Sequence, residues 1–281
     1  MPLNPQTTRS LLQSLQHDPR KLLGQNFLVD GNIVRKSIAM ADLKTGETVV
    51  EIGPGLGTLT RELLASGVKV HAVELDNNLQ AHLRETLLKE HPGQFQLIAG
   101  DAVAYPLARI APDCECKVVA NLPYAISTPW MDALLNQPTL PKKMVLMLQK
   151  EAAERLIALP GSKHCGAVSI LLRSAYSTGE RHPVAASCFH PPPKVESCLI
   201  TLDRLASPIR FPPAARQAMR AAFIYRRKQL RALCRKDPAV ARLEHWLEDC
   251  IADGLNPQIR AEAIPLERWQ TLPKYMDGTA C

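Results

Sequence analysis

A glycine-rich turn that begins with a carboxylate runs from Glu51 to Gly57 (EIGPGLG), and includes Gly53 and Gly55. Glycines at this spacing let a backbone turn sharply and approach a ligand closely. A dinucleotide site would have G-x-G-x-x-G, so that a pyrophosphate meets a helix N-terminus. Here the spacing is G-x-G-x-G, and Glu51 would repel a pyrophosphate but pair with an ammonium group. S-adenosylmethionine carries an ammonium group and no phosphate, so we expect this ligand; the alternative is a plain tight turn.

Two further carboxylates follow later predicted strands. Glu74 ends the apolar alternation within the run VKVHAVEL and can accept hydrogen bonds from both hydroxyls of a ribose. Its alternative role is to cap the following helix, which suits Asp76 better. Asp101 follows the third strand and can accept a hydrogen bond from an adenine amino group, although an Asp there is commonly a turn residue. Because ligands of open α/β sheets bind at the carboxyl ends of strands, we expect both acids in one cofactor site.

The tetrapeptide Asn121-Leu122-Pro123-Tyr124 follows a fourth predicted strand. An exocyclic base amine is a poor nucleophile because its lone pair is delocalised into the ring. The Asn121 side-chain oxygen and a backbone carbonyl of Leu122 or Pro123 can each accept one N–H, which directs the lone pair at a methyl group. Pro123 stiffens the loop, and Tyr124 offers a stacking face for an extruded base, worth roughly 1–3 kcal/mol. The alternative is an Asn-Pro turn with a surface Tyr, against which the ordered series of strand ends argues.

Two other segments are weaker candidates. Gly24–Leu28 (GQNFL) precedes the sheet and is either a lid over the cofactor or a turn that enters a helix. Phe189 stands in a rigid loop, FHPPPK, where it either stacks on the other face of the target base or serves as a packing plug. We expect the adjacent His190 to be structural rather than a base.

The charge of the chain favours a polyanionic partner. The 281 residues carry a formal net charge of +7, and between Arg204 and Arg242 eleven Lys or Arg residues accompany one acid, Asp237. Such a local field suggests a phosphate-facing surface, while a solvated helix face is the alternative. The residues that we expect to contact RNA are Arg220, Arg226, Arg227, Lys228 and Arg231.

Other features exclude some classes of protein. No apolar run approaches the roughly 20 residues that span a bilayer, and the first 20 residues lack the apolar core of a secretory signal. We therefore expect a cytoplasmic protein without a membrane segment. Eight cysteines include no CxxC pair, so a metal site is not expected and free thiols are the better interpretation.

The elements that must position these residues alternate between strands and helices. The predicted strands are 48–53, 68–75, 95–98, 117–120 and 144–148, and the predicted helices are 58–65, 77–90, 127–135 and 150–158. This alternation predicts an α/β fold whose sheet is mostly parallel, with helices on both faces. Two more predicted strands, 168–176 and 197–202, are joined by a Pro-rich link and predict an antiparallel sheet edge.

After Leu202 the pattern becomes helical, over 214–235, 240–251 and 265–272. We therefore expect three parts. Residues 1–20 form a loose polar arm with a short helix near 10–16, residues 21–204 form the cofactor-binding domain, and residues 205–281 form a small, basic, all-helical RNA-binding domain.

The chain resembles a known family, the ribosomal RNA adenine dimethyltransferases that act on the small ribosomal subunit. The similarity extends from Lys21 to about Leu272. It is carried by KLLGQNFL (21–28), VEIGPGLGTLT (50–60), ELD (74–76), GDA (100–102), NLPYAISTP (121–129), LQKE (148–151), FHPPPKVES (189–197), AFIYRRKQLR (222–231) and GLNPQIRA (254–261). One departure is Tyr225, where the family often has a polar amide.

The resemblance implies a Rossmann-like methyltransferase domain with a small helical C-terminal domain. It implies that the protein uses S-adenosylmethionine to dimethylate the N6 amines of two adjacent adenosines in the 3′-terminal hairpin of small-subunit rRNA, during late small-subunit biogenesis. We expect a monomer whose partner is a precursor of the small subunit. The resemblance places cofactor contacts at Asn26, Leu28, Gly53, Glu74, Asp101 and Asn121, and the target-base site at Asn121, Pro123, Tyr124 and Phe189.

Three alternatives remain. Related large-subunit rRNA methyltransferases that confer antibiotic resistance share the lid, the glycine loop and a similar Asn-x-Pro-Tyr, but the helical domain and the FHPPPKVES loop favour the small-subunit enzymes. A non-catalytic ribosome-assembly or transcription factor is disfavoured by the intact Asn121–Tyr124 loop. DNA amino-methylation is disfavoured because no separate DNA-reading domain is apparent.

Overall fold

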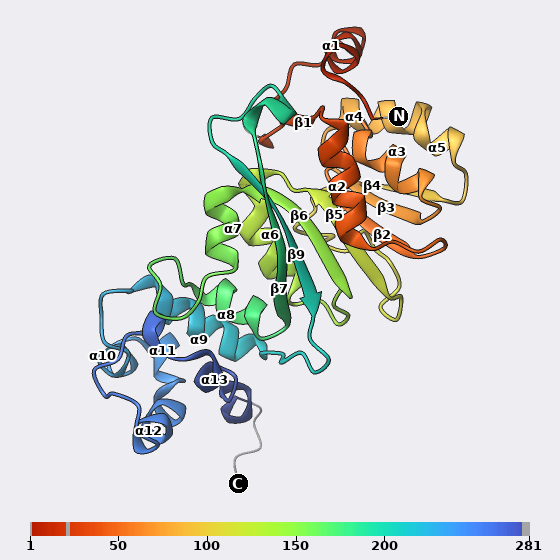
Figure 1. The fold of residues 1–281 in the computed structure, drawn as a ribbon. Helices are drawn as coiled ribbons and strands as arrows, with labels where there is room; N and C mark the ends of the chain where they lie inside the picture. Colours follow the sequence, from red (N-terminus) through yellow and green to blue (C-terminus); the bar gives the residue numbers. More distant parts are fainter. Residues whose placement is uncertain (1, 21–22, 277–281) are drawn as a thin grey trace. The chain divides into compact units, whose positions relative to one another are not determined.

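The computed structural model describes residues 2–20 and 23–276 (Figure 1). Contacts between Cα atoms divide the chain into two units. The first comprises residues up to 153 together with 178–204, and the second comprises 154–177 together with the residues from 205 onward. Residues 1, 21–22 and 277–281 lie outside the described residues, and so do the expected starts of the arm and of the cofactor-binding domain and the expected end of the helical domain.

A seven-stranded sheet forms the centre of the first unit, in the order β4-β3-β2-β5-β6-β9-β7 (Figure 1). β2 to β6 run parallel to one another, and β9 runs antiparallel to β6. The strands are β2 (Thr48–Ile52), β3 (Lys69–Glu74), β4 (Phe95–Ala99), β5 (Cys116–Asn121), β6 (Lys143–Gln149), β7 (Tyr176–Val184) and β9 (Ser197–Arg204). The predicted α/β fold with a mostly parallel sheet and an antiparallel edge is confirmed.

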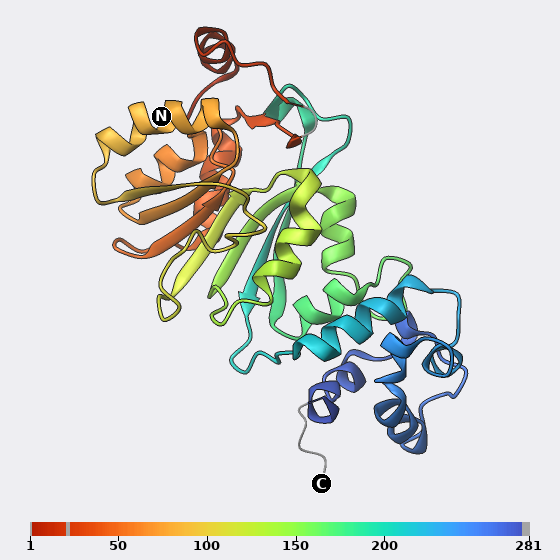
Figure 2. The same cartoon turned by 180° about the vertical axis from the view of Figure 1, so that it is seen from behind.

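Helices cover both faces of this sheet because its inner strands are apolar on both sides. α2 and α3 lie over one face and α6 over the other (Figures 1 and 2). The helices of this unit are α1 (Pro5–Ser14), α2 (Gly31–Ala41), α3 (Thr58–Ala65), α4 (Asn77–Glu85), α5 (Leu87–Glu90), α6 (Ser127–Leu134), and the short η2 (Tyr124–Ile126) and η3 (Ala186–Cys188). α7 (Lys150–Leu156) crosses from the first unit into the second.

The parallel register brings four strand ends to one edge. Ile52 of β2 pairs with Val73 of β3, and Glu74 pairs with Ala99 at the end of β4. On the other side of β2, β5 runs parallel to it and ends at Asn121. The segments that follow these strands therefore meet at the carboxyl edge of the sheet, where ligands of this fold class bind.

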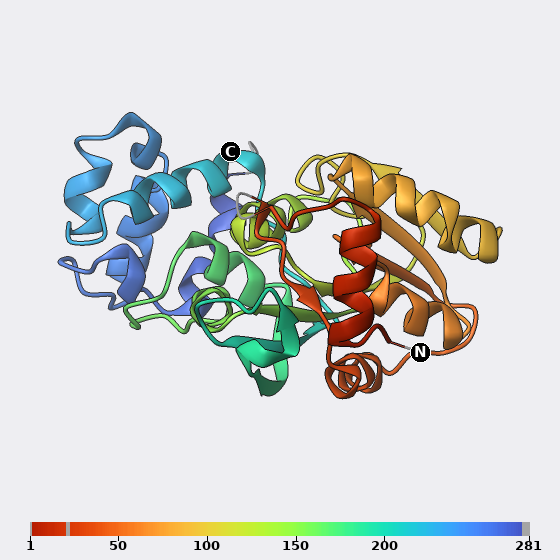
Figure 3. The same ribbon diagram turned by 90° about the horizontal axis from the view of Figure 1, so that it is seen from above.

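A second, two-stranded sheet lies at this same edge. It pairs β1 (Phe27–Leu28) with β8 (Phe189–His190) in antiparallel register, so that Leu28 lies opposite Phe189. Seen from above, α1 lies across the edge beside this small sheet (Figure 3). The expected arm, residues 1–20, is not loose over its described part, 2–20: its helix starts at Pro5 and buries Thr8 and Leu12. The helix begins where Asn4 accepts a hydrogen bond from the Thr7 N–H, ahead of the start expected from apolar spacing.

The second unit is helical and is built around stacked tryptophans. Its elements are α8 (Ala167–Arg173), α9 (Pro213–Ile224), α10 (Leu230–Cys234), α11 (Pro238–Ala241), α12 (Glu244–Ala252), α13 (Leu266–Trp269), η4 (Ala261–Ala263) and η5 (Leu272–Tyr275). The rings of Trp246 and Trp269 stack with centroids 4.7 Å apart, and both are fully buried. The expected range 21–204 is therefore interrupted, because residues 154–177 pack with this unit.

The predicted strand 168–176 is wrong, and the predicted helices 77–90, 214–235 and 240–251 are each interrupted. Residues 168–176 were expected to form a strand, but α8 occupies most of this range. A short apolar run does not distinguish a buried strand from a buried helix, and here Gly166 and Ser169 form a capping pair that starts a helix. The neighbouring strand is β7, whose YSTGERHPV sequence has the charged and Pro-containing character of a sheet edge. The predicted helix 214–235 is also interrupted after Ile224, so Arg226, Arg227 and Lys228 lie in a turn.

Candidate active site

A pocket opens at the carboxyl edge of the sheet. It holds about 1040 Å³ of space free of protein atoms, part of which is open to solvent. Eleven of the predicted site residues line it: Asn26, Leu28, Glu51, Gly53, Gly55, Glu74, Asp101, Asn121, Leu122, Pro123 and Tyr124. A concave site that combines apolar side chains with a few convergent polar groups is typical of small-molecule binding.

The glycine loop follows β2 and passes close to two other segments of the pocket. Gly53 and Gly55 have φ values of 66° and 59°, a left-handed conformation that glycine adopts without strain. A Cβ atom on Gly53 would lie 3.1 Å from the ring of Pro123, and one on Gly55 would lie 3.1 Å from the ring of Phe27. The two glycines therefore permit the close packing that shapes the pocket wall.

Glu51 lies near the end of β2 and is only 2% exposed. Its Oε2 atom finds no hydrogen-bond partner among the described residues. Burial raises the pKa of the Glu51 carboxyl to about 8, and repulsion from Glu74 adds to this effect. A buried carboxyl with an unsatisfied oxygen at a pocket wall is a site at which a cationic ligand group would be stabilised.

Glu74, at the end of β3, is held by backbone donors. Its Oε2 accepts a hydrogen bond from the Gly55 N–H at 3.0 Å, and its Oε1 accepts one from the Asp76 N–H at 2.9 Å. Burial raises the pKa of the Glu74 carboxyl, and these two N–H groups oppose that shift. The carboxylate is thus fixed in orientation, and each oxygen keeps a further lone pair for a ligand.

The wall beside Asp101 combines polar and apolar groups. Asp101 is exposed, and its Oδ1 accepts a hydrogen bond from the Val103 N–H at 2.8 Å, which is a turn contact. Leu75 lines the same pocket with 51% of its surface exposed, and Ala102 lines it too. Leu75 and Ala102 were not predicted as site residues. The signal was available, since each directly follows a predicted acid at a strand end.

Asn121 connects the tetrapeptide to the segment Gly24–Leu28. Its Nδ2 donates a hydrogen bond to the backbone carbonyl of Asn26, with 3.1 Å between the heavy atoms. Because a carbonyl can only accept, this contact directs the amide nitrogen of Asn121 toward Asn26. The Oδ1 atom is then left to accept a hydrogen bond from another group. The same two segments meet again at Gly24, whose Cβ position lies 3.3 Å from the Tyr124 nitrogen.

Tyr124 is held through its hydroxyl. The Tyr124 Oη and Ser197 Oγ atoms are 2.7 Å apart, which ties the loop to the start of β9. Burial raises the pKa of the Tyr124 phenol, so the hydroxyl stays neutral at physiological pH. The ring remains partly exposed and lines the pocket, as a stacking face requires.

Phe189 is not among the described residues that line the pocket. It is 3% exposed and belongs to the apolar cluster that includes Leu28, Val184 and Cys188. Its position results from pairing of β8 with β1, which places Phe189 opposite Leu28. The structure therefore favours the packing-plug alternative over stacking on a target base.

The basic residues of the second unit fall into two groups. Arg226 binds Glu262 through Nε at 2.8 Å, and Arg231 makes a two-point contact with Glu248 at 2.8 and 2.9 Å. Arg227 and Lys228 are exposed, as is Arg220 on α9. Sequence reasoning missed the acids, because Glu248 and Glu262 lie outside the basic stretch.

Arg227 and Lys228 border a surface hollow of about 930 Å³ within the second unit. Its other lining residues are Lys163, Ile224, Tyr225, Arg226 and Glu262. Ile224 and Tyr225 are 73% and 44% exposed. Exposed aromatic and apolar side chains beside cations are typical of surfaces that contact nucleic acid.

The strand order, the glycine loop after the first parallel strand and the acids at the next strand ends define a Rossmann-like methyltransferase. Two solved structures share this fold. One is a dimethyladenosine transferase from Plasmodium falciparum, with TM-score 0.69 and 27% identity over 88% of this chain and 95% of that chain. The other is the 23S rRNA methyltransferase ErmE, with TM-score 0.62 and 26% identity over 90% of this chain and 100% of that chain.

Residues 16–276 match the family described as ribosomal RNA adenine dimethylase, and the chain belongs to that family. Two relatives carry the name ribosomal RNA small subunit methyltransferase A. The one from Opitutus terrae is 53% identical over 97% of this chain and 98% of its own length. The one from Thiobacillus denitrificans is 38% identical over 92% of this chain and 98% of its own length.

Proposed function

We propose that this chain uses S-adenosylmethionine to dimethylate the N6 amines of two adjacent adenosines in the 3′-terminal hairpin of small-subunit rRNA. The names of its relatives support the substrate class. The observation that carries the chemistry is the hydrogen bond from Asn121 to the Asn26 carbonyl. It orients an acceptor oxygen at the same sheet edge as the two buried acids, Glu51 and Glu74.

The pocket fits S-adenosylmethionine by charge and by shape. Glu51 and Glu74 are two buried carboxyls whose pKa values are raised by burial. A cationic ligand would stabilise the charged form of both carboxyls. Glu51 would hold the ammonium group and Glu74 the ribose hydroxyls. Leu75, exposed at the pocket, would pack on the adenine ring, and Asp101 would accept from its amino group. When bound, the cofactor supplies an activated methyl group.

The tetrapeptide would prepare the target amine. One N–H would donate to Asn121 Oδ1 and the other to the carbonyl of Leu122 or Pro123, so that the nitrogen lone pair points at the methyl carbon. After methyl transfer the target nitrogen would be cationic, and its proton would then leave to water. The protein need not supply a general base before methyl transfer, because the amine nitrogen becomes acidic only after it has gained the methyl group. The Tyr124 ring would hold the extruded adenine by stacking.

The second unit would hold the RNA. Lys163, Arg227 and Lys228 are exposed cations around one hollow, whereas Arg226 and Arg231 are each paired with a glutamate. We therefore assign phosphate contact to the exposed group and a structural role to the paired arginines. Arg220 on α9 is exposed, and its contact with RNA stays a prediction. We also propose that the protein acts as a cytoplasmic monomer on a precursor of the small subunit.

The test uses methyl-labelled cofactor with immature small and large ribosomal subunits, supplied separately. Label in the small-subunit rRNA, mapped to two adjacent adenosines as N6-dimethyladenosine, is the expected result. The runner-up is modification of large-subunit rRNA, which the likeness to ErmE favours. Label confined to the large subunit would overturn the proposed target. Absence of transfer to either subunit, with RNA binding retained, would favour a non-catalytic role.

A further inference from the structure

Asp76 is a buried carboxylate that the proposed reaction does not use. It is 1% exposed and lies just after β3, two residues beyond Glu74. Its Oδ1 caps α4 by accepting from the Asn78 N–H at 2.9 Å and the Leu79 N–H at 3.3 Å. A cap needs only one carboxylate oxygen, so the cap alone leaves the second oxygen unexplained.

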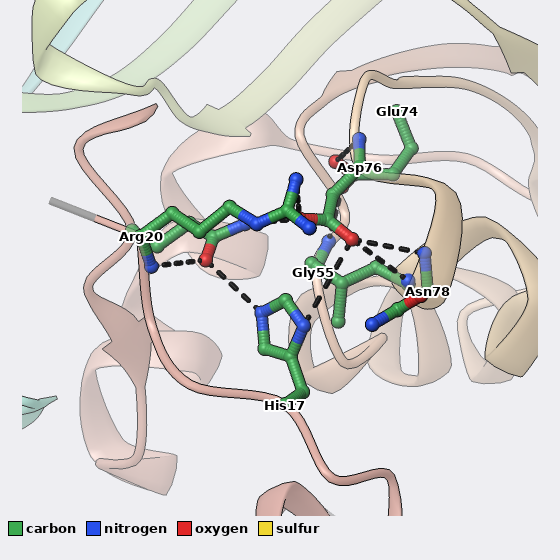
Figure 4. Close-up of polar contacts among 8 residues, drawn as sticks. His17, Arg20, Gly55, Glu74, Asp76 and Asn78 are labelled. Atoms are coloured by element: carbon green, nitrogen blue, oxygen red, sulfur yellow. Dashed lines mark hydrogen bonds and ion pairs between the residues drawn. The ribbon is translucent and has the colours of Figure 1, made fainter. Parts of the chain in front are cut away.

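The other contacts of Asp76 come from the start of the chain (Figure 4). Arg20 Nη1 lies 3.2 Å from Asp76 Oδ2, and Gln25 Nε2 donates to the same oxygen at 3.3 Å. His17 Nδ1 lies 3.9 Å from Oδ1. A buried carboxylate with these partners is costly to leave unpaired, so the contacts hold the N-terminal segment against the sheet edge.

Gln25 also binds both His17 and Arg20. Gln25 Oε1 accepts a hydrogen bond from the Arg20 N–H at 2.7 Å and lies 3.1 Å from His17 Nε2. His17 is 4% exposed, although it stands in a polar stretch of sequence. Gln25 itself lines the cofactor pocket. The network thus begins in the segment after α1 and ends at the pocket wall.

An apolar cluster makes the same connection. Leu12 of α1 packs with Phe27, Leu56 and Leu79, and Leu3, Leu11 and Leu15 pack against this cluster. Phe27, Leu56 and Leu79 all line the pocket. The docked α1 therefore packs against side chains that also form part of the pocket wall.

Asp76 also connects to the acid that faces the ligand. The Asp76 N–H donates to Glu74 Oε1, and Gly55 in the glycine loop donates to the other Glu74 oxygen. Gln80, one turn into α4, donates from Nε2 to the Glu74 carbonyl at 2.9 Å. The turn that anchors the N-terminal segment is therefore the turn that positions Glu74 (Figure 4).

We propose that Asp76 is a positioning residue that anchors residues 5–20, here named the strap, and that the anchored strap raises the affinity of the pocket for S-adenosylmethionine. This inference rests on the proposed function. Coupling between two binding events is reciprocal, so ligand binding also stabilises the docked strap. If the strap only added stability to the fold, ligand binding would not stabilise the docked strap.

The test measures S-adenosylhomocysteine binding by calorimetry and hydrogen exchange of residues 5–20 in the full chain. Asp76→Asn keeps the cap on α4, because Asn caps helices as well as Asp does, but it removes the charge that faces Arg20. Arg20→Gln changes a side chain that is 55% exposed, so this variant keeps the fold. The matched control is Asp237→Asn, which changes another N-cap aspartate, in the helical unit.

We expect Asp76→Asn and Arg20→Gln each to raise the Kd for S-adenosylhomocysteine by about 10-fold, which is within the usual range of coupling energies. The double variant should bind the ligand only slightly more weakly than either single variant, because the two substitutions remove the same contact. KM for the cofactor should rise with kcat nearly unchanged. Ligand should slow exchange of the strap in the wild type and in Asp237→Asn, but not in the two anchor variants.

The inference fails if the wild type binds the ligand and both anchor variants bind it with wild-type Kd. It also fails if ligand binding leaves strap exchange unchanged in the wild type. Failure of the wild type itself to bind S-adenosylhomocysteine would instead contradict the proposed function.

Discussion

The side-chain amide of Asn121 donates to the backbone carbonyl of Asn26, a contact between residues 95 positions apart in the chain. It joins the tetrapeptide at the end of β5 to the segment that begins β1. Since the amide nitrogen is used in this way, the acceptor oxygen of Asn121 has one orientation. An Asn, with one donor end and one acceptor end, can make this contact and still offer an acceptor to the pocket.

Substitution of Asn121 tests both ends of the amide. Asn121→Ala should retain RNA binding and lose nearly all methyl transfer. Asn121→Asp keeps an acceptor oxygen of the same size but places a carboxylate against the Asn26 carbonyl. We expect kcat to fall on the order of 100-fold or more in both variants, as when one aligned hydrogen bond is lost from a transition state. Single-turnover transfer with small-subunit rRNA measures this, and unchanged transfer in Asn121→Ala would exclude the proposed role.

The Glu51 carboxyl predicts a pH dependence of stability. Its pKa is about 8 in the folded protein, compared with an ordinary value of 4.5. Between these pH values the unfolded chain loses the proton and the folded chain keeps it. The free energy of unfolding therefore falls as the pH rises from about 4.5 to about 8.

Glu51→Gln removes this titration. The variant should gain stability relative to the wild type as the pH rises from 5 to 8, by up to a few kcal/mol. Urea unfolding at both pH values, without ligand, measures the difference. A stability difference that is equal at pH 5 and pH 8 would show that burial does not raise the Glu51 pKa. In the same variant, S-adenosylhomocysteine should bind more weakly, because the partner of its ammonium group is gone.

Tyr124 separates a stacking role from a hydrogen-bonding role. Tyr124→Phe loses the hydroxyl contact with Ser197 but keeps the ring, so kcat/KM for RNA should change only a few-fold. Ser197→Ala removes the same hydrogen bond from the other side and should match it. Tyr124→Ala should cost roughly 1–3 kcal/mol, or about 5- to 150-fold in kcat/KM. Equal losses in Tyr124→Phe and Tyr124→Ala would argue against stacking.

The two groups of basic residues should differ in salt dependence. Arg227→Gln and Lys228→Gln should each weaken RNA binding and reduce the slope of log K against log salt by about 1. Arg231→Gln instead breaks the contact with Glu248, so it should lower thermal stability more than it changes the salt slope. Filter binding at several salt concentrations, with melting curves for each variant, distinguishes the groups. A salt slope that falls only in Arg231→Gln would reverse the assignment.

Local sequence patterns determined the sheet and the order of the acids along its edge. β2, β3, β4 and β5 are short apolar runs that each end at a polar residue or directly before a glycine. Parallel strands bring such ends together whatever the connecting helices contain. The glycine loop, Glu74, Asp101 and the tetrapeptide could therefore be placed in one pocket from sequence. The predicted strand at 168–176 was wrong because a short apolar run fits a helix as well as a strand.

Tertiary structure decided what depends on pairing between distant segments. Phe189 is buried because β8 pairs with β1, and Arg226 and Arg231 are neutralised by glutamates outside the basic stretch. Burial also gives Glu51 a raised pKa that its sequence position does not imply. A sequence pattern records which side chains share a strand or helix face. The dielectric surroundings and ion-pair partners of a side chain arise only when segments far apart in the chain are packed together.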